Sequence, residues 1–228
     1  MIAPRGLGIL GLVLAVLAMP GMASAQAATV NKAASIAAKS ADSEPRFAGW
    51  DSVTRLHKAL QSITAKGATT SYDKRVAVLG PVVRTVFDMT SMTRLVMGPA
   101  WQSANPAQRT QLRNAFEDFT IANYARRFSF QGDVRFEEIG QREPPARDEA
   151  LLMTRLLPPG DRNIRLDYRM RLDPAAKAWK IMDVFVDGTI SEAATRRGEF
   201  GSVYRSAGID GLLKMIQDKT QQLAQAGS

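Results

Sequence analysis

Apolar and polar residues alternate strictly through residues 163–174, NIRLDYRMRLDP. The apolar positions are Ile164, Leu166, Tyr168, Met170 and Leu172. Successive side chains of a strand point to opposite faces of a sheet, so this pattern predicts a strand with one apolar face and one charged face. The apolar face can contact only the protein's own helices, or it can also contact a molecule that binds and leaves.

A two-residue period recurs on both sides of this segment. We expect strands at 134–142, 149–157, 164–172 and 179–186. The connecting segments PPARD, PPGDRN and DPAAKA are short and rich in turn-forming residues. Short connections between consecutive strands predict a four-stranded antiparallel meander.

Elsewhere the apolar residues are three and four positions apart, which is typical of helices. We expect helices at 50–66, 72–87, 90–97, 106–128, 190–207 and 211–225. Asn105, Pro106 and Gln108 predict a capping box at the start of the fourth helix. Gly80-Pro81 predicts a kink in the second. The expected fold class is α+β, with the helices packed on one face of the sheet.

The first 25 residues are typical of a signal peptide. Arg5 precedes an apolar run at 7–19, and Ala23-Ser24-Ala25 fits a small-residue cleavage site. We therefore expect cleavage near Ala25 and export to a bacterial periplasm, with an uncleaved membrane anchor as the alternative. Residues 26–47 are rich in Ala, Ser and Lys and predict a flexible leader. Residues 48–225 are then a single domain.

Composition narrows the function classes. The chain has no cysteine, which excludes disulfides and thiol catalysis. Its net charge of +8 suits an anionic membrane or an acidic partner. The basic residues are scattered and no nucleic-acid recognition motif accompanies them, so we expect no nucleic-acid binding.

Enzyme chemistry has few candidate residues. His57 is the single histidine, and its neighbour Lys58 suggests a surface position on a helix. A catalytic triad, a histidine or cysteine zinc site and a phosphate-binding loop are all missing from the sequence. Asp183 and Asp187 could form a carboxylate pair of a small hydrolase. We expect Asp183 to share a face with Ile181 and to be a hydrogen-bonded structural group.

The apolar strand faces are the remaining functional candidate. We assign to them Leu151, Met153, Leu166, Tyr168, Met170, Met182, Val184 and Val186. Methionine adapts to irregular space and to variable ligands. From the residues alone, these side chains either form an ordinary core or line a cavity.

Several segments in fixed order carry a family resemblance. They are FDMTSMTRLVMGPAW (87–101), NPAQRTQLRNAFEDFTIANYARRF (105–128), IRLDYRMRL (164–172), AWKIMDVFVDGTIS (178–191), and RRGEFGSV with GIDGLLKMI between 196 and 216. Together they resemble the MlaC family, also called the toluene-tolerance auxiliary family, over residues 50–223. VMGPAW and DGTISEAATRRGEF are more similar to the HpnM branch, which is associated with hopanoids.

The resemblance implies a non-enzymatic periplasmic lipid carrier without a cofactor. Such a protein holds acyl chains, or a hopanoid, in an apolar slot between sheet and helices. It exchanges lipid with an inner-membrane ABC transporter complex and an outer-membrane lipoprotein complex, comes close to the membrane transiently, and is expected to be a monomer. An adaptor domain with a completely filled core is a further alternative.

If the resemblance holds, twelve side chains line the slot. They are Leu151, Met153, Leu166, Tyr168, Met170, Val184, Val186, Val96, Met97, Trp101, Phe119 and Tyr124. Trp101 would lie at the slot edge or pack under a helix. The pairs Arg126-Arg127 and Arg196-Arg197 would contact a phosphate or form solvated helix faces. Gly98-Pro99, Gly80-Pro81 and Gly188 are candidate hinges.

Overall fold

A computed structural model of the chain describes residues 46–65, 71–142 and 148–226. The predicted signal peptide (1–25) and the predicted leader up to residue 45 lie outside the described residues, so both stay predictions. No helix of the described residues has the length and apolar character needed to cross a bilayer.

The sheet has five antiparallel strands in the order β1-β2-β3-β4-β5. They are β1 (Arg135–Arg142), β2 (Glu149–Leu157), β3 (Ile164–Asp173), β4 (Ala178–Val186) and β5 (Ile190–Ser191). The predicted meander is confirmed, but the predicted number of four strands is wrong. Asp187 and Gly188 adopt positive φ angles of 51° and 73° in a tight turn. This turn returns the chain so that Ile190 pairs with Val186 before the last helix begins.

The helices largely match the predicted ranges. They are α2 (Gly49–Thr64), α3 (Tyr72–Val86), α4 (Met89–Met97), α5 (Pro99–Ser103), α6 (Pro106–Arg127) and α7 (Glu192–Gln225). The capping box of α6 is confirmed: the Gln108 amide nitrogen donates to Asn105 Oδ1 at 2.9 Å, and the Asn105 amide donates to Gln108 Oε1 at 3.0 Å. The helix α3 continues through Pro81, and the short α5 was not predicted.

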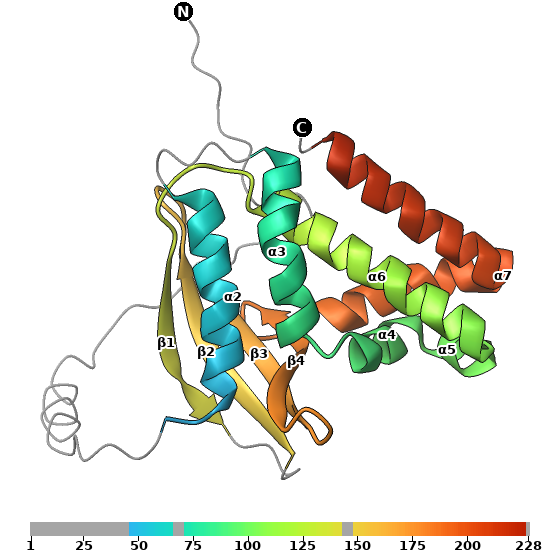
Figure 1. Cartoon of the computed structure of the whole chain (residues 1–228), viewed down its shortest axis with the longest axis horizontal. Helices are drawn as coiled ribbons and strands as arrows, with labels where there is room; N and C mark the ends of the chain where they lie inside the picture. Colours follow the sequence, from blue (N-terminus) through green and yellow to red (C-terminus); the bar gives the residue numbers. More distant parts are fainter. Residues whose placement is uncertain (1–45, 66–70, 143–147, 227–228) are drawn as a thin grey trace, which may run out of the picture. The chain divides into compact units, whose positions relative to one another are not determined.

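Strand register decides which side chains face the helices. Tyr168 on β3 lies opposite Leu152 on β2 and Val184 on β4, and directly opposite residues share a face. The helix α2 packs against β4 and β2, so it covers this face (Figure 1). Phe87 bridges to Ile181 and extends the contact between the end of α3 and β4.

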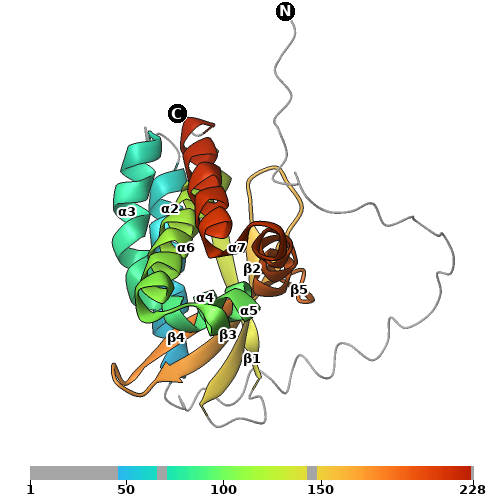
Figure 2. The same ribbon diagram turned by 90° about the vertical axis from the view of Figure 1, so that its right-hand side faces the viewer.

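The remaining helices form a second group beyond β4. Figures 1 and 2 show α4, α5, α6 and α7 gathered on that side, and α7 packs on α6 and α4. We call α2, α3 and the sheet the sheet region, and α4 to α7 the helical region.

The opposite face of the sheet carries paired charges. Arg165 Nη2 lies 2.8 Å from Asp167 Oδ2, and Arg169 Nη2 lies 2.8 Å from Glu149 Oε2. Asp167 is only 1% exposed, because its carboxylate lies under the Arg165 guanidinium. The charged residues of the alternating segment therefore form ion pairs on the solvent side, as the pattern predicts.

Candidate functional site

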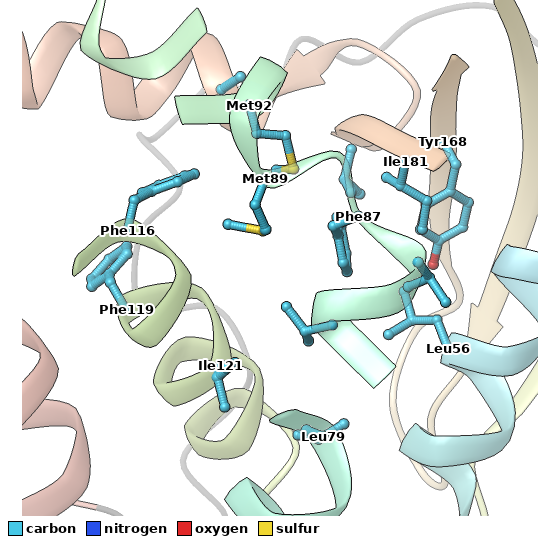
Figure 3. Packing of buried hydrophobic residues seen from close by; sticks show 14 of the residues in the cluster. Leu56, Leu79, Phe87, Met89, Met92, Phe116, Phe119, Ile121, Tyr168 and Ile181 are labelled. Carbon is cyan, nitrogen blue, oxygen red and sulfur yellow. The ribbon is translucent and has the colours of Figure 1, made fainter. Parts of the chain in front are cut away.

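The interior of the sheet region is apolar and closely packed. Tyr168, Met170 and Ile181 from the sheet are 1% exposed or less, and Leu56 and Leu60 of α2 pack in the same cluster. Their burial follows from the alternation on β3 and the three- to four-residue spacing on α2. Figure 3 shows Leu56, Tyr168 and Ile181 on one side of Phe87. Phe87 connects this cluster to the helical region.

The interior continues into the helical region with a different composition. Met89 and Met92 of α4 face Phe116 and Phe119 of α6 (Figure 3). Phe200 of α7 packs edge-on against Phe116 and Phe119, with ring centroids 6.3 and 6.0 Å apart. The unbranched thioether side chain of methionine adapts to the shape of what it contacts. This half of the interior is the more adaptable one.

A buried polar pair lies inside the sheet region. His57 Nε2 lies 3.0 Å from the Tyr168 hydroxyl, and the His57 ring stacks on Phe136 at 3.7 Å. His57 is 7% exposed, so the predicted surface position is wrong. The prediction failed because consecutive residues of a helix point in different directions. An exposed Lys58 therefore does not imply an exposed His57. Burial lowers the pKa of His57 to about 3, so the imidazole is neutral in the folded protein.

Two buried tyrosines add to the polar content of the interior. Burial raises the pKa of Tyr168 and of Tyr124, so both hydroxyls stay protonated. The Tyr124 ring stacks on Phe128 and lies 5.8 Å from Phe87. These hydroxyls can donate or accept hydrogen bonds but do not carry charge near neutral pH.

Most of the predicted lining residues point into this continuous interior. Those buried or packed against its core are Leu166, Tyr168, Met170, Val184, Val186, Val96, Met97, Trp101, Phe119 and Tyr124. Trp101 is half-buried on α5, and the Arg109 guanidinium lies 5.6 Å from its ring centroid. The structure thus brings together side chains from α4, α5, α6, β3 and β4.

Leu151 and Met153 do not belong to this interior. They lie opposite Arg169 and Asp167, so they face away from the helices, and the predicted facing of both is wrong. Leu152 occupies the inward position between them and is fully buried. The segment EALLMTRLL is apolar almost throughout, and such a run does not define a face by itself.

The predicted slot stays a prediction. The described residues show one continuous cluster of buried side chains from both regions. A surface groove of about 400 Å³ does lie between α6 and the second half of α7. Six of its eight lining residues have polar side chains: Gln111, Asn114, Asp118, Gln217, Thr220 and Gln221, beside Ala115 and Leu213.

The carboxylates of the hydrolase alternative have structural roles. Asp183 is 5% exposed and accepts from Ser191 Oγ at 2.6 Å and from the Ala193 amide at 3.1 Å. It therefore holds the start of α7 against β4. Asp187 forms an exposed ion pair with Arg162 at 3.1 Å. These contacts do not favour a role in acid–base catalysis.

The predicted facing of Asp183 is wrong in one respect. Asp183 lies opposite Arg169, whereas Ile181 lies opposite Met170, because β4 carries one extra residue at this point. Such a bulge reverses the faces of the residues on its two sides. Asp183 and Ile181 therefore point to opposite sides of the sheet.

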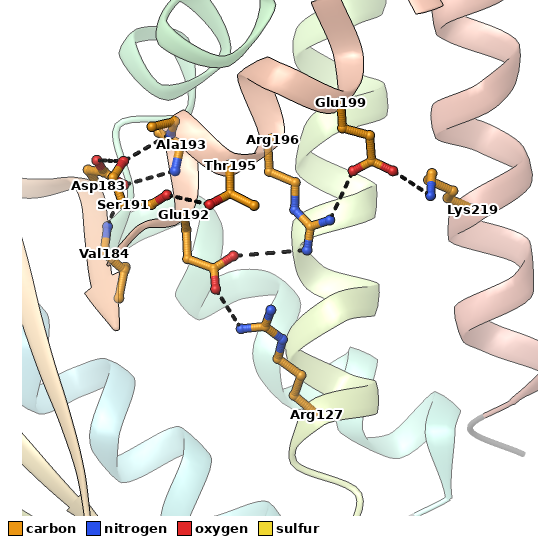
Figure 4. A network of polar contacts seen from close by, with 11 residues as sticks. Arg127, Asp183, Val184, Ser191, Glu192, Ala193, Thr195, Arg196, Glu199 and Lys219 are labelled. Atoms are coloured by element: carbon orange, nitrogen blue, oxygen red, sulfur yellow. Dashed lines mark hydrogen bonds and ion pairs between the residues drawn. The ribbon is translucent and has the colours of Figure 1, made fainter. Parts of the chain in front are cut away.

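One arginine of each predicted pair, Arg127 and Arg196, takes part in an ion-pair chain (Figure 4). Arg127 contacts Glu192 at 3.0 Å, Arg196 contacts Glu199 at 3.2 Å, and Lys219 contacts Glu199 at 2.6 Å. The chain joins α6 to both halves of α7. Arg196 also lies over the Phe119 ring, 5.1 Å from its centroid.

Sequence reasoning missed several interior residues. Leu152, Phe87, Met92, Phe116 and Phe200 were not among the predicted lining residues, yet each is at most 6% exposed. Phe116 and Phe200 lie on helices whose apolar spacing marks the correct face. The helical periodicity of the sequence is therefore the signal that identifies Phe116 and Phe200 as buried residues.

A sequence profile of the MlaC protein family matches residues 54–218. The chain belongs to the MlaC family. The matched segment runs from α2 to the second half of α7, so the MlaC assignment covers both the sheet region and the helical region. Membership of the HpnM branch stays a prediction.

A solved structure has the same fold as this MlaC-family chain. It is the phospholipid-binding protein from Ralstonia solanacearum, determined in complex with a phospholipid. The TM-score is 0.64 at 21% sequence identity, and the match covers 78% of this chain and 98% of the other. At that identity the likeness concerns the fold.

Proposed function

We propose that this MlaC-family protein is a lipid carrier that holds acyl chains in the interior shared by its two regions. The family match over residues 54–218 is the observation that carries the proposal. The shared fold with a protein solved in complex with a phospholipid supports it. The carrier is non-enzymatic and works in the periplasm after removal of the signal peptide.

The proposed position of the acyl chains is the junction around Phe87. Inward residues of β3 and β4 lie on one side of it, and Met89, Met92 and Phe119 lie on the other. Lipid bound here would part these side chains, because they belong to one buried cluster. The thioethers of α4 have three rotatable bonds and can move aside at low cost.

The strength of such binding determines how lipid is released. Each buried methylene contributes about 0.8 kcal/mol, so about thirty would contribute roughly 24 kcal/mol before costs. Non-covalent affinities reach a limit near 18–21 kcal/mol, and ordering costs reduce the sum. Release into water is therefore slow. The lipid passes instead to a bilayer or a partner that offers equivalent apolar surroundings.

This requirement supports transfer at membrane complexes. We extend the proposal to exchange with an inner-membrane ABC transporter complex and an outer-membrane lipoprotein complex. The cargo is a glycerophospholipid or a hopanoid. The net charge of +8 favours approach to anionic bilayers.

The second candidate is an adaptor domain that docks without carrying lipid. The continuous cluster of buried side chains in the described residues favours it. The two candidates differ in whether the purified protein contains lipid, and this difference can be measured directly.

The test is mass spectrometry of organic extracts from protein purified without detergent. A carrier yields close to one lipid per protein, and the spectrum identifies glycerophospholipid or hopanoid. Extracts without lipid from well-folded protein would leave the adaptor as the function.

A matched pair of variants locates the lipid. Met170→Trp enlarges an inward side chain that is fully buried, whereas Met153→Trp enlarges one on the opposite face. The carrier predicts less lipid per folded molecule for Met170→Trp and unchanged loading for Met153→Trp. Equal loading of folded Met170→Trp and Met153→Trp would place the lipid elsewhere.

A further inference from the structure

Building on the proposed function, we infer that the first half of α7, residues 192–207, is a hinged gate through which lipid reaches the interior. We call this segment the arm. The ion-pair chain of Figure 4 holds the arm closed.

The arm covers the adaptable half of the interior. Its Phe200 is fully buried against Phe116 and Phe119 of α6, and Ala193 is buried at its start. The helix α7 packs on both α4 and α6. Lifting the arm would therefore expose the Phe and Met side chains of the helical region without breaking the sheet.

The C-terminal end of the arm has hinge geometry. Gly208 has φ 66° and ψ −163°, which interrupts the helix. Glycine adopts such angles without steric strain, so the chain can rotate there at low cost. The N-terminal end is held, because β5 pairs with β4 and Asp183 accepts from Ser191 and Ala193. The arm can therefore move at its Gly208 end while its start stays on the sheet.

The interior of the arm is also weakly helical. A Cβ atom at Gly198 would meet nothing within 4 Å, and one at Gly201 would lie 3.4 Å from Arg205 Nη1. Packing therefore does not require glycine at either position. Glycine is the least favourable helix residue after proline. Because these two glycines weaken the helix without being required by packing, we infer that the arm opens more readily than the neighbouring helices.

The ion pairs that attach the arm are mostly exposed, in contrast to its buried Phe200. Arg127 to Glu192 ties it to α6, and Lys219 to Glu199 ties it to the second half of α7. Arg127 and Lys219 side chains are 44% and 37% exposed, so salt screens these contacts. Asp183 holds the N-terminal end through Ser191 and Ala193. The Gly208 end of the arm can therefore separate from α6 while the Asp183 end stays attached to β4.

The described part of the sheet region would have to break more backbone hydrogen bonds to open. A continuous ladder joins β2 to β3, and α2 is anchored inside by the His57 contact to Tyr168. Opening the arm instead breaks exposed ion pairs and uncovers Phe200. The arm is therefore the route that leaves the β-ladders intact.

The test measures transfer of a fluorescent phospholipid from loaded protein to vesicles of phosphatidylethanolamine and phosphatidylglycerol. Gly198→Ala/Gly201→Ala should slow transfer by about fivefold or more, because alanine stabilises the closed helix. Glu199→Gln should speed transfer. In the wild-type protein added salt should also speed transfer, and the effect should be smaller in Glu199→Gln.

Thr110→Ala is the matched control. Thr110 is an exposed residue in α6, outside the arm, and alanine there also favours helix. Its transfer rate should equal that of the wild-type protein. Equal transfer rates for the wild-type protein, Gly198→Ala/Gly201→Ala and Glu199→Gln would overturn the gate.

Hydrogen exchange separates failure of the gate from failure of lipid carriage. Amides of the arm should exchange faster than those in the middle of α6, and Gly198→Ala/Gly201→Ala should slow them. If the protein holds lipid but the arm exchanges as slowly as α6, the gate is wrong and the carrier stands. If the protein holds no lipid, carriage fails, and a slowly exchanging arm would overturn the hinge as well.

Discussion

The sheet region and the helical region bury their apolar side chains in different ways. In the sheet region, β-ladders and the His57 to Tyr168 contact fix the positions of inward side chains. In the helical region, Phe and Met side chains meet between helices that are joined at Gly98 and Gly208. Hydrogen-bonded registers allow one arrangement, whereas packed helices can shift. The contrast teaches that a fold can combine a rigid frame with an adaptable interior.

The largest expected effect comes from a cavity in the rigid frame. Leu56→Ala removes a fully buried side chain of α2 and should lower the free energy of unfolding by about 3 kcal/mol. Urea denaturation measures the change. A decrease in the free energy of unfolding below about 1 kcal/mol would mean that neighbouring side chains move into the cavity. The sheet region would then not be the more rigid of the two regions.

The next effect concerns pH. The pKa of His57 is lowered to about 3 when folded, so the unfolded chain binds a proton first as pH falls. Stability is therefore fully present above the unfolded pKa near 6.5 and is lost progressively below it. Between pH 7 and pH 5 the loss should be about 2 kcal/mol.

His57→Gln tests the origin of this pH dependence. Glutamine can still hydrogen-bond to Tyr168 but does not titrate. Urea denaturation at pH 7 and pH 5 should show a smaller difference for His57→Gln than for the wild-type protein. The same difference in both proteins would assign the acid sensitivity to other groups.

A smaller effect is expected where the two regions join. Asp183→Asn keeps the size of the side chain but removes the charge that accepts from Ser191 and Ala193. The free energy of unfolding should fall by about 1–2 kcal/mol. Hydrogen exchange should show the loss concentrated at the start of α7. An unchanged start of α7 would show that Asp183 does not hold the arm.

The smallest effect is expected on the surface. Lys219→Met removes an exposed contact to Glu199 and should change global stability by less than about 1 kcal/mol. Thermal unfolding measures this change. A decrease of several kcal/mol in the free energy of unfolding would show that the ion-pair chain contributes strongly to global stability. The two regions would then not differ in rigidity.

Much of the fold was readable before the structure. Alternation marked four strands within a residue or two, and the Asn105 capping box marked the start of α6. These are local signals, because side-chain period and caps depend on near neighbours. The order of segments in the chain also carried the family resemblance, which the match over residues 54–218 confirms.

The candidate site was only partly predictable. Tyr168, Met170 and Phe119 were placed inward correctly, but Leu151 and Met153 were placed on the wrong face. In a run of apolar residues either alternate set of side chains can face the helices, and only pairing with β3 determines which set does. His57 was misplaced for a related reason, since only the packing of α2 on Phe136 and Tyr168 decides its burial.

Local patterns predicted the element types, the meander and the family, because periodicity, caps and short turns act between residues that are close in the chain. Tertiary packing sets the facing of β2, the bulge that turns Asp183 away from Ile181, and the burial of His57. It also places α7 on α4 and α6 and brings Glu192 to Arg127. These features depend on contacts between residues far apart in sequence, where strand register and helix packing choose among arrangements that are locally equivalent.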